Sequence, residues 1–221
     1  MALEGKGFYL WQILRTEGGS ATAIANAAVQ AGLTHVLIKI ADGDHAYNLH
    51  PTTGADLVPP VLQALRDRNI EVWGWHYVYG YAPNAEADIA ISRIQQLGVA
   101  GYIIDAEMQY EEPGRDAAAR QFMSRLRLAL PNFPIALSSF RYPTYHPAFP
   151  WQAFLERVDI NMPQVYWVGR ITLAPSSRAV CVNSKPSRPS ARSSPPARPT
   201  CKAIGSPPRR RLSSSWTPPE T

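Results

Sequence analysis

The sequence contains little cysteine and no long apolar run. Its two cysteines, Cys181 and Cys201, lie in the last fifth of the chain, so the part before them has neither a disulfide nor a thiolate metal site. No apolar stretch reaches the roughly 20 residues that a membrane-spanning helix needs. The first 19 residues lack a basic segment, and Gln12 interrupts their apolar stretch. We therefore expect no signal peptide, no membrane partner, and a cytoplasmic location by default, with extracellular release by another route as the alternative.

Sequence motifs of several common enzyme classes are also absent. The chain has no G-x-S-x-G, no glycine-rich phosphate-binding loop and no H-E-x-x-H. The histidines are scattered without the spacing of metal ligands: His35, His45, His50, His76 and His146. We therefore predict neither a cofactor nor a metal.

The net charge of +5 is unevenly distributed along the chain. Residues 1–170 contain 13 lysines and arginines against 16 aspartates and glutamates, a net charge of −3. Residues 171–221 contain 9 against 1, a net charge of +8. A mildly acidic body offers no basic face for phosphates, so we expect no nucleic-acid partner for residues 1–170.

Short apolar runs alternate with helical patterns at intervals of about thirty residues, which is typical of parallel βαβ units. One helical pattern is formed by Val58, Val61, Leu62 and Leu65. Six runs are expected to be strands: 7–13, 34–40, 71–79, 101–107, 134–140 and 159–167.

An open doubly wound sheet and a closed barrel both fit this α/β alternation. Polar and aromatic residues gather at the carboxyl ends of the runs, where barrel enzymes build their sites, and this favours a (β/α)8 TIM barrel. An eight-unit barrel takes about 250 residues. We therefore predict an incomplete TIM barrel of about six βα units over residues 1–170.

Residues 171–221 are rich in Ser, Pro, Arg and Ala and have no apolar period, so we expect a disordered C-terminal tail. Three interpretations remain open: a basic arm for anionic partners, ordinary linker composition, or a shifted reading frame near codon 170. Translation of the other two frames tests the third, which requires two further strand and helix units.

Asp105 and Glu107 are the strongest candidates for catalysis. They are two residues apart at the end of the apolar run GYIIDAE, so on a strand both side chains point to one face. Like charges placed side by side favour a shared proton, which suits the cleavage of a glycosidic bond. We predict Glu107 as the general acid and Asp105 as its charge-stabilising partner. The alternative is a structural ion pair with Lys39 or Arg141.

The run 71–79 alternates between bulky and small residues. Its small residues and His76 alternate with its aromatic residues, so the two groups lie on opposite faces of a strand. The first group suits a crowded barrel interior, and the aromatic residues suit the helix layer. We therefore expect His76 to point toward the carboxylates, as either a substrate-binding or a hydrogen-bonded core residue. Tyr79, past the end of the run, is expected to stack on a sugar or to pack locally.

Amide, phenol and guanidinium groups at the ends of later runs suit the recognition of sugar hydroxyls. Ser138, Ser139 and Arg141 end the fifth run, and Gln164, Tyr166 and Trp167 end the sixth.

These segments resemble glycoside hydrolase family 25, the lysozyme-type muramidases. HVLIKIADGD, GWHYVYG, IIDAE and MPQVYW are similar to the second, third, fourth and sixth strand segments of that family. The resemblance implies a TIM barrel with Glu107 as catalytic acid, Asp105 as assisting carboxylate, and Gln164 and Tyr166 in the substrate groove, with Lys39 at the end of the second strand. Where the family has an Asp at the end of its first strand, this chain has Trp11 and Gln12.

The sequence therefore predicts an O-glycosyl hydrolase acting on a bacterial cell-wall or related amino-sugar polysaccharide. Its groove residues are expected to be His76, Tyr79, Lys39, Gln164, Tyr166, Arg141 and Gln12. Three alternatives remain: a non-catalytic carbohydrate-binding barrel, a chitinase-like hydrolase of family 18, and an inactive incomplete barrel with exposed sheet edges. The sequence predicts no oligomeric state.

Overall fold

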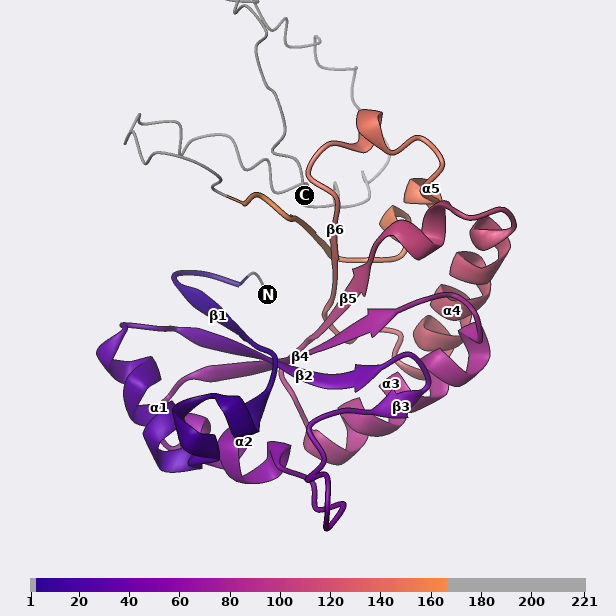
Figure 1. The fold of residues 1–221 in the computed structure, drawn as a ribbon. Helices are drawn as coiled ribbons and strands as arrows, with labels where there is room; N and C mark the ends of the chain where they lie inside the picture. Colours follow the sequence, from indigo (N-terminus) through magenta and orange to yellow (C-terminus); the bar gives the residue numbers. More distant parts are fainter. Residues whose placement is uncertain (1–2, 167–221) are drawn as a thin grey trace, which may run out of the picture. The chain divides into compact units, whose positions relative to one another are not determined.

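The computed structural model describes residues 3–166 (Figure 1). Six parallel strands form one sheet and lie in chain order, and the two-residue β3 (His45–Ala46) pairs antiparallel with β2. The parallel strands are β1 (Gly7–Leu10), β2 (His35–Asp42), β4 (Glu71–Val78), β5 (Tyr102–Ala106), β6 (Ile135–Ser139) and β7 (Ile160–Pro163).

Helices connect the consecutive parallel strands. They are α1 (Ala21–Gln30), α2 (Val58–Arg66), α3 (Pro83–Leu97), α4 (Arg115–Ala129) and the short α5 (Trp151–Leu155). Four single-turn 3₁₀ segments follow strands β1, β5 and β6: Ile13–Arg15, Glu17–Gly19, Met108–Glu111 and Pro143–Tyr145. None of the helices in residues 3–166 has the length and apolar character of a membrane span.

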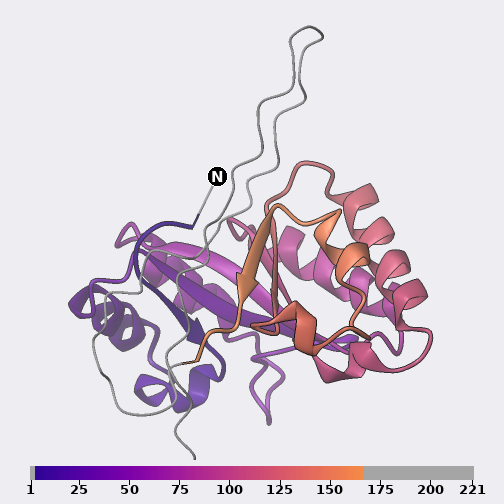
Figure 2. The same cartoon turned by 90° about the horizontal axis from the view of Figure 1, so that it is seen from above.

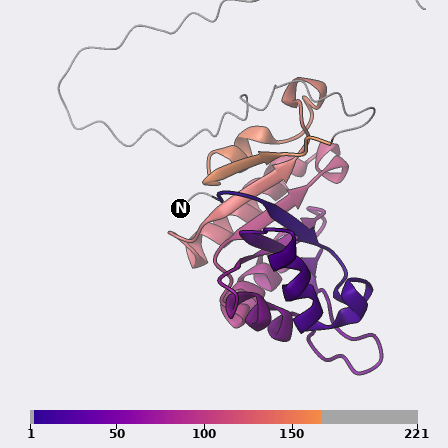
Figure 3. The ribbon, with the colours of Figure 1, turned by 90° about the vertical axis from the view of Figure 1, so that its left-hand side faces the viewer.

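The expected six strands are therefore present, and the sheet is a curled parallel half-barrel. Figures 2 and 3 show the strands side by side, from the indigo β1 to the orange β7. Within the described residues, β1 pairs only with β2, and β7 pairs only with β6. The predicted tail and Trp167 lie outside the described residues.

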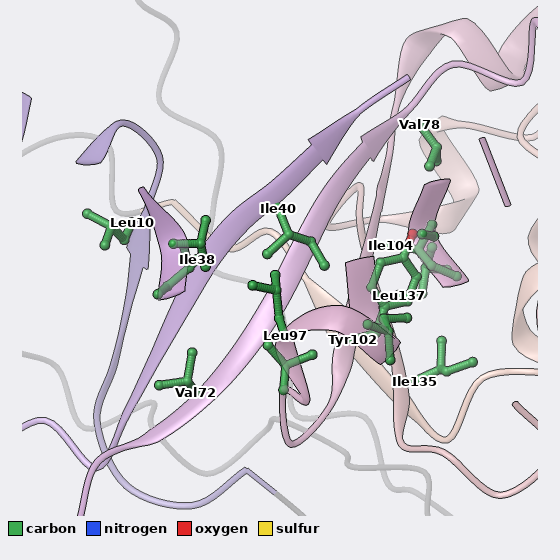
Figure 4. Packing of buried hydrophobic residues seen from close by; sticks show 14 of the residues in the cluster. Leu10, Ile38, Ile40, Val72, Val78, Leu97, Tyr102, Ile104, Ile135 and Leu137 are labelled. Carbon is green, nitrogen blue, oxygen red and sulfur yellow. The ribbon is translucent and has the colours of Figure 1, made fainter. Parts of the chain in front are cut away.

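The main core lies between the sheet and the helices. Strand residues such as Ile38, Val72, Ile104 and Leu137 lie close together in the core (Figure 4). They form one buried cluster with apolar residues of all five helices. Because each side chain is almost fully removed from water, burial contributes about 1.5–3 kcal/mol per large residue. This cluster fixes the convex side of the half-barrel.

The concave side of the sheet has a smaller apolar cluster of its own. Its buried members are Leu37, Trp73, Trp75, Ile103 and Ala136. No helix residue belongs to this cluster. The concave face is therefore partly apolar, and the polar residues described below lie toward the carboxyl ends of its strands.

The two faces of β4 are the reverse of those expected from the sequence. Tyr77 is the sheet partner of Asp105, and paired residues of parallel strands project to the same face. The aromatic residues of β4 therefore point to the concave face, and His76 points to the convex, helix-facing side. The physical reason is close packing there: a Cβ on Gly74 would lie 2.5 Å from Cδ1 of Ile40, so the convex face has no space for large rings at this point.

The loop after β4 is held by the buried carboxylate of Glu86 in the first turn of α3. Its two oxygens accept hydrogen bonds from the backbone N–H groups of residues 79–82, at 3.0–3.3 Å. A carboxylate also interacts favourably with the positive end of a helix. Glu86 thereby fixes the backbone that carries Tyr79 and Tyr81.

Candidate functional site

Asp105 and Glu107 lie together on the concave face at the carboxyl end of β5. Nε2 of Gln164 donates to Oδ1 of Asp105 and to Oε1 of Glu107, both at 2.9 Å. Both carboxyl groups are partly buried. Residues 3–166 contain no ion pair between either carboxylate and a cation, so the structure lacks the expected alternative of a bridge to Lys39 or Arg141.

Burial, followed in size by the adjacent negative charge of Glu107, raises the pKa of Asp105 to about 7. The ammonium of Lys39 and the hydrogen bond from Gln164 oppose this rise. Near neutral pH, Asp105 is therefore protonated in a large fraction of molecules. The raised pKa belongs to Asp105, whereas the sequence predicted the proton on Glu107.

Gln164 follows β7 and reaches across β6 to the carboxylates. Its Nε2 also lies 3.4 Å from Oγ of Ser138, and its Oε1 accepts a hydrogen bond from Oη of Tyr166 at 3.1 Å. The Tyr166 ring is otherwise largely exposed. The structure therefore brings both predicted residues of the last run to the carboxylate pair.

Lys39 lies on the concave face with Asp42, and its Nζ is 2.5 Å from Oδ2 of Asp42. A break in the β2–β4 register between Lys39 and Ala41 leaves Ile40 as an extra residue, so Asp42 pairs with Tyr77. Without this bulge, residues three apart would face opposite sides of the sheet. The bulge therefore places a cation and its counter-ion beside the carboxylate pair.

The Lys39 ammonium is buried among aromatic rings. Its Nζ lies 4.4 Å from the ring centroid of Tyr47 and 4.8 Å from that of Trp75, and the rings of Trp11 and Tyr77 are each 5.8 Å away. Such cation–π contacts compensate part of the cost of removing the charge from water. Lys39 is thus a fixed positive charge in the wall of the site.

A row of tyrosines runs from the carboxylates to the rim. The Tyr77 hydroxyl donates to Oε1 of Gln109 at 2.9 Å, and the Tyr79 hydroxyl donates to Oδ1 of Asp42 at 2.8 Å. The Tyr79 and Tyr81 rings are stacked with centroids 5.9 Å apart, and the Tyr81 side chain is 61% exposed. This row offers flat apolar surfaces next to acidic groups.

Sequence reasoning missed several residues of this face. Tyr9 pairs with Leu37, so it projects to the concave side, where burial raises its pKa to about 12. Burial also raises the pKa of Tyr77 to about 12, with the charge of Glu107 as the next cause. Asp42 was missed as well, although the acidic turn after the second run was a signal for it.

Two predicted site residues, His76 and Arg141, form no hydrogen bond or ion pair with the carboxylates within residues 3–166. His76 is completely buried on the convex side, where its ring nitrogens contact Oη of Tyr102 and the carbonyl of Gly43, each at 2.7 Å. Burial lowers its pKa to about 4, so the ring is neutral at physiological pH. The prediction that His76 faces the carboxylates is wrong, because strand register puts it on the other face. Arg141 is exposed and lies over the ring of Tyr142, 4.7 Å from its centroid.

Gln12 lies at the edge of the site. Its Nε2 is 3.3 Å from Oη of Tyr47, one of the rings that surround Lys39.

Residues 3–166 contain no group of three or more side chains arranged to bind a metal ion. The arrangement as a whole can exchange a proton through a carboxyl pair, between aromatic surfaces and hydrogen-bonding groups.

Comparisons with known proteins give a distant structural likeness. No protein-family model and no curated protein sequence matches the chain. Among solved structures, the chain is similar to the crystal structure of the Legionella pneumophila ChiA C-terminal domain, with 14% identity and a TM-score of 0.43. The alignment covers 71% of this chain, which spans 56% of the length of that one.

Proposed function

We propose that this protein is a glycoside hydrolase-like protein that acts on a cell-wall or related amino-sugar polysaccharide. The half-barrel would be the first six units of a (β/α)8 barrel. One observation carries the proposal: the amide of Gln164 holds Asp105 and Glu107 together at the carboxyl end of β5, among aromatic rings. Barrel enzymes place their catalytic groups at this end.

In the proposed reaction, the carboxyl pair holds one proton near neutral pH. Glu107, which lies beyond the end of β5, passes this proton to the glycosidic oxygen as the bond from that oxygen to the sugar carbon breaks. The pair then carries a second negative charge, which the N–H groups of Gln164 and the Lys39 ammonium stabilise. Water adds to the sugar carbon as hydroxide, and its proton returns to the pair.

The spacing of the pair bears on the stereochemical outcome. Oδ1 of Asp105 and Oε1 of Glu107 both accept from one nitrogen at 2.9 Å, so they are no further apart than twice that distance. Inverting enzymes separate their two carboxyl groups by about 6.5–9.5 Å to admit a water molecule. Asp105 is therefore not the water-activating base of an inverting reaction. We propose instead that Asp105 supports Glu107.

Two family assignments fit the proposal. The muramidases of family 25 are favoured by the positions of Gln164 and Tyr166 beside the carboxylates. Chitinase-like hydrolases of family 18 are the alternative. A non-catalytic carbohydrate-binding protein is the second candidate function, and it is favoured by the end of β1, where Trp11 and Gln12 stand in place of a carboxylate.

The loss of turbidity of a bacterial cell-wall suspension, measured with the full chain, tests the proposal. Wild-type protein should clear the suspension, and Glu107→Gln should be at least about 100-fold slower, the lower range of a general acid's contribution. Glu156→Gln, at the exposed position directly after α5, is the matched control and should retain the wild-type rate. Equal rates for wild type and Glu107→Gln would contradict the catalytic role. Sedimentation with the cell walls, without clearing by any variant, would favour the binding protein.

A further inference from the structure

A pocket lies beside Tyr47, one of the aromatic rings that surround Lys39. It lies between the segment after β1 and the segment that runs from β3 to α2, and we call it the β1–β3 pocket. Its volume is about 440 Å³, within the ~300–1,000 Å³ range of small-molecule sites. Its lining consists of Gln12, Leu14, Arg15, Ala46, Tyr47, Asn48, Leu49, Pro51 and Leu57.

The pocket and the carboxylate site share a wall. Tyr47 lines the pocket, and its ring centroid lies 4.4 Å from Nζ of Lys39, whose charge acts on Asp105. Gln12 also lines the pocket and donates to the Tyr47 hydroxyl at 3.3 Å. A polymer lying along the concave face at Tyr47 therefore has its next units beside the pocket.

The pocket is built on a fixed backbone. Oδ1 of the buried Asn48 accepts from the backbone N–H of Ile13 at 2.9 Å. Its Nδ2 donates to the carbonyl groups of Trp11, at 3.0 Å, and Lys39, at 2.8 Å. Asn48 thereby ties both walls of the pocket to the end of β2.

The chemistry of the lining indicates the kind of group that fits. Leu49, Pro51 and Leu57 supply apolar surface, and Gln12 supplies an amide. Arg15 is the one charged residue among those that line the pocket, and within residues 3–166 it forms no ion pair. A guanidinium binds a carboxylate through two parallel hydrogen bonds.

We propose that the β1–β3 pocket is a second subsite that receives a carboxylate-bearing sugar unit of the polysaccharide, with Arg15 pairing with the carboxylate. This inference rests on the proposed function. It makes Arg15 a specificity-determining residue, because the acidic pair Asp105 and Glu107 repels an anionic unit at its own end of the groove. In one polymer, the charged unit would therefore bind at Arg15, and the neutral unit would bind at Asp105 and Glu107.

Binding of two hexasaccharides to the full chain tests this inference. Hyaluronan hexasaccharide alternates N-acetylglucosamine with a carboxylate-bearing sugar, and chitohexaose is neutral. Both are measured by calorimetry in a Glu107→Gln background, which prevents hydrolysis. Adding Arg15→Gln should weaken hyaluronan binding about tenfold, as expected for a charge-assisted hydrogen bond, and should change chitohexaose binding less than twofold. Arg157→Gln, on the surface after α5, is the control and should change neither.

The outcomes separate the two proposals. Equal weakening of both sugars by Arg15→Gln, or no weakening of either, would overturn the subsite and leave the proposed function standing. Binding of neither sugar before Arg15 is changed would overturn the subsite, and the turbidity of the cell-wall suspension would still decide the proposed function. In the expected case, raising the salt concentration should weaken hyaluronan binding with Arg15 present and have a smaller effect in its absence.

Discussion

Lys39 and Asp42 are three residues apart on one strand, and their side chains nonetheless form an ion pair on the same face, with Nζ 2.5 Å from Oδ2. The β-bulge at Ile40 makes this possible. The carbonyl of the extra residue is still satisfied, because it accepts from Nε of Arg93 at 3.1 Å and from the backbone N–H of Tyr47 at 2.9 Å. The bulge is therefore a built part of the site.

Replacement of Lys39 by Met should raise the pKa of Asp105 above its value of about 7, because the nearby positive charge that lowers this pKa is lost. The same change leaves Asp42 without its cation and should lower the free energy of unfolding by about 3–5 kcal/mol. NMR titration of the Asp105 carboxyl carbon, assigned with Asp105→Asn, measures the first effect. Lys39→Arg keeps the charge and serves as control, and an unchanged titration in Lys39→Met would contradict the assignment.

Replacement of Asp105 by Asn should stabilise the protein at pH 8 and have little effect near pH 4. The pKa of Asp105 is raised in the folded state to about 7 from its usual value of 3.8, so the folded protein holds the proton more tightly than the unfolded chain. Its contribution to stability is complete below pH 3.8 and is lost as the pH rises through 7. Urea unfolding of both proteins between pH 4 and 8 measures the difference. The exposed Asp44→Asn is the control, and a difference that does not grow with pH would refute the prediction.

The sequence established most of the strands but only part of the site. The runs containing Ile38, Ile104 and Leu137 are apolar and regularly spaced, and each forms a strand of the half-barrel. Asp105 and Glu107 share a face because strand periodicity alone requires it. These inferences depend on local pattern, which a single sequence contains.

The remaining features depend on pairing between strands. Every residue of β4 from Val72 to Val78 is buried or half-buried, so alternation defines two faces without showing which one the helices cover. Only the pairing of Tyr77 with Asp105 settles this, and it reverses the expected position of His76. The bulge at Ile40, which brings in Asp42, likewise has no local signature in the sequence.

Replacement of Gln164 by Leu should weaken the carboxylate site and lower the free energy of unfolding by about 1–3 kcal/mol. The change leaves Asp105 and Glu107 without their shared hydrogen-bond donor. Each carboxyl group then accepts a hydrogen bond from water or has no donor. The pKa of Asp105 should rise as well, because the hydrogen bond from Gln164 lowers it. Chemical denaturation and NMR titration measure the two effects. Gln152→Leu, on the exposed face of α5, should show neither, and a Gln164→Leu protein of unchanged stability and titration would contradict the bridging role.

Replacement of His76 by Phe should lower the free energy of unfolding by about 1–3 kcal/mol at neutral pH, because the Tyr102 hydroxyl and the Gly43 carbonyl lose a buried partner. The pKa of His76 is lowered in the folded state to about 4, so its contribution is present above pH 6.5 and is lost as the pH falls through 4. The deficit of the variant should therefore shrink toward pH 4.

Guanidinium unfolding across this pH range checks the prediction for His76. The exposed His45→Gln should behave like wild type. A deficit that grows toward acidic pH would show that His76 is charged in the folded protein, and it would reopen a role for this residue in the site.

The strands lie beside one another in the order in which the chain is synthesised. A ribosome delivering the chain from its amino end therefore adds each strand to the edge of a sheet that is already present. Asp105 and Glu107 emerge on β5 well before Gln164, which follows the last strand of the half-barrel and is separated from Asp105 by 59 positions. During synthesis the acidic pair is thus without its Gln164 bridge, and the hydrogen-bonded geometry of the site forms only when the final strand docks.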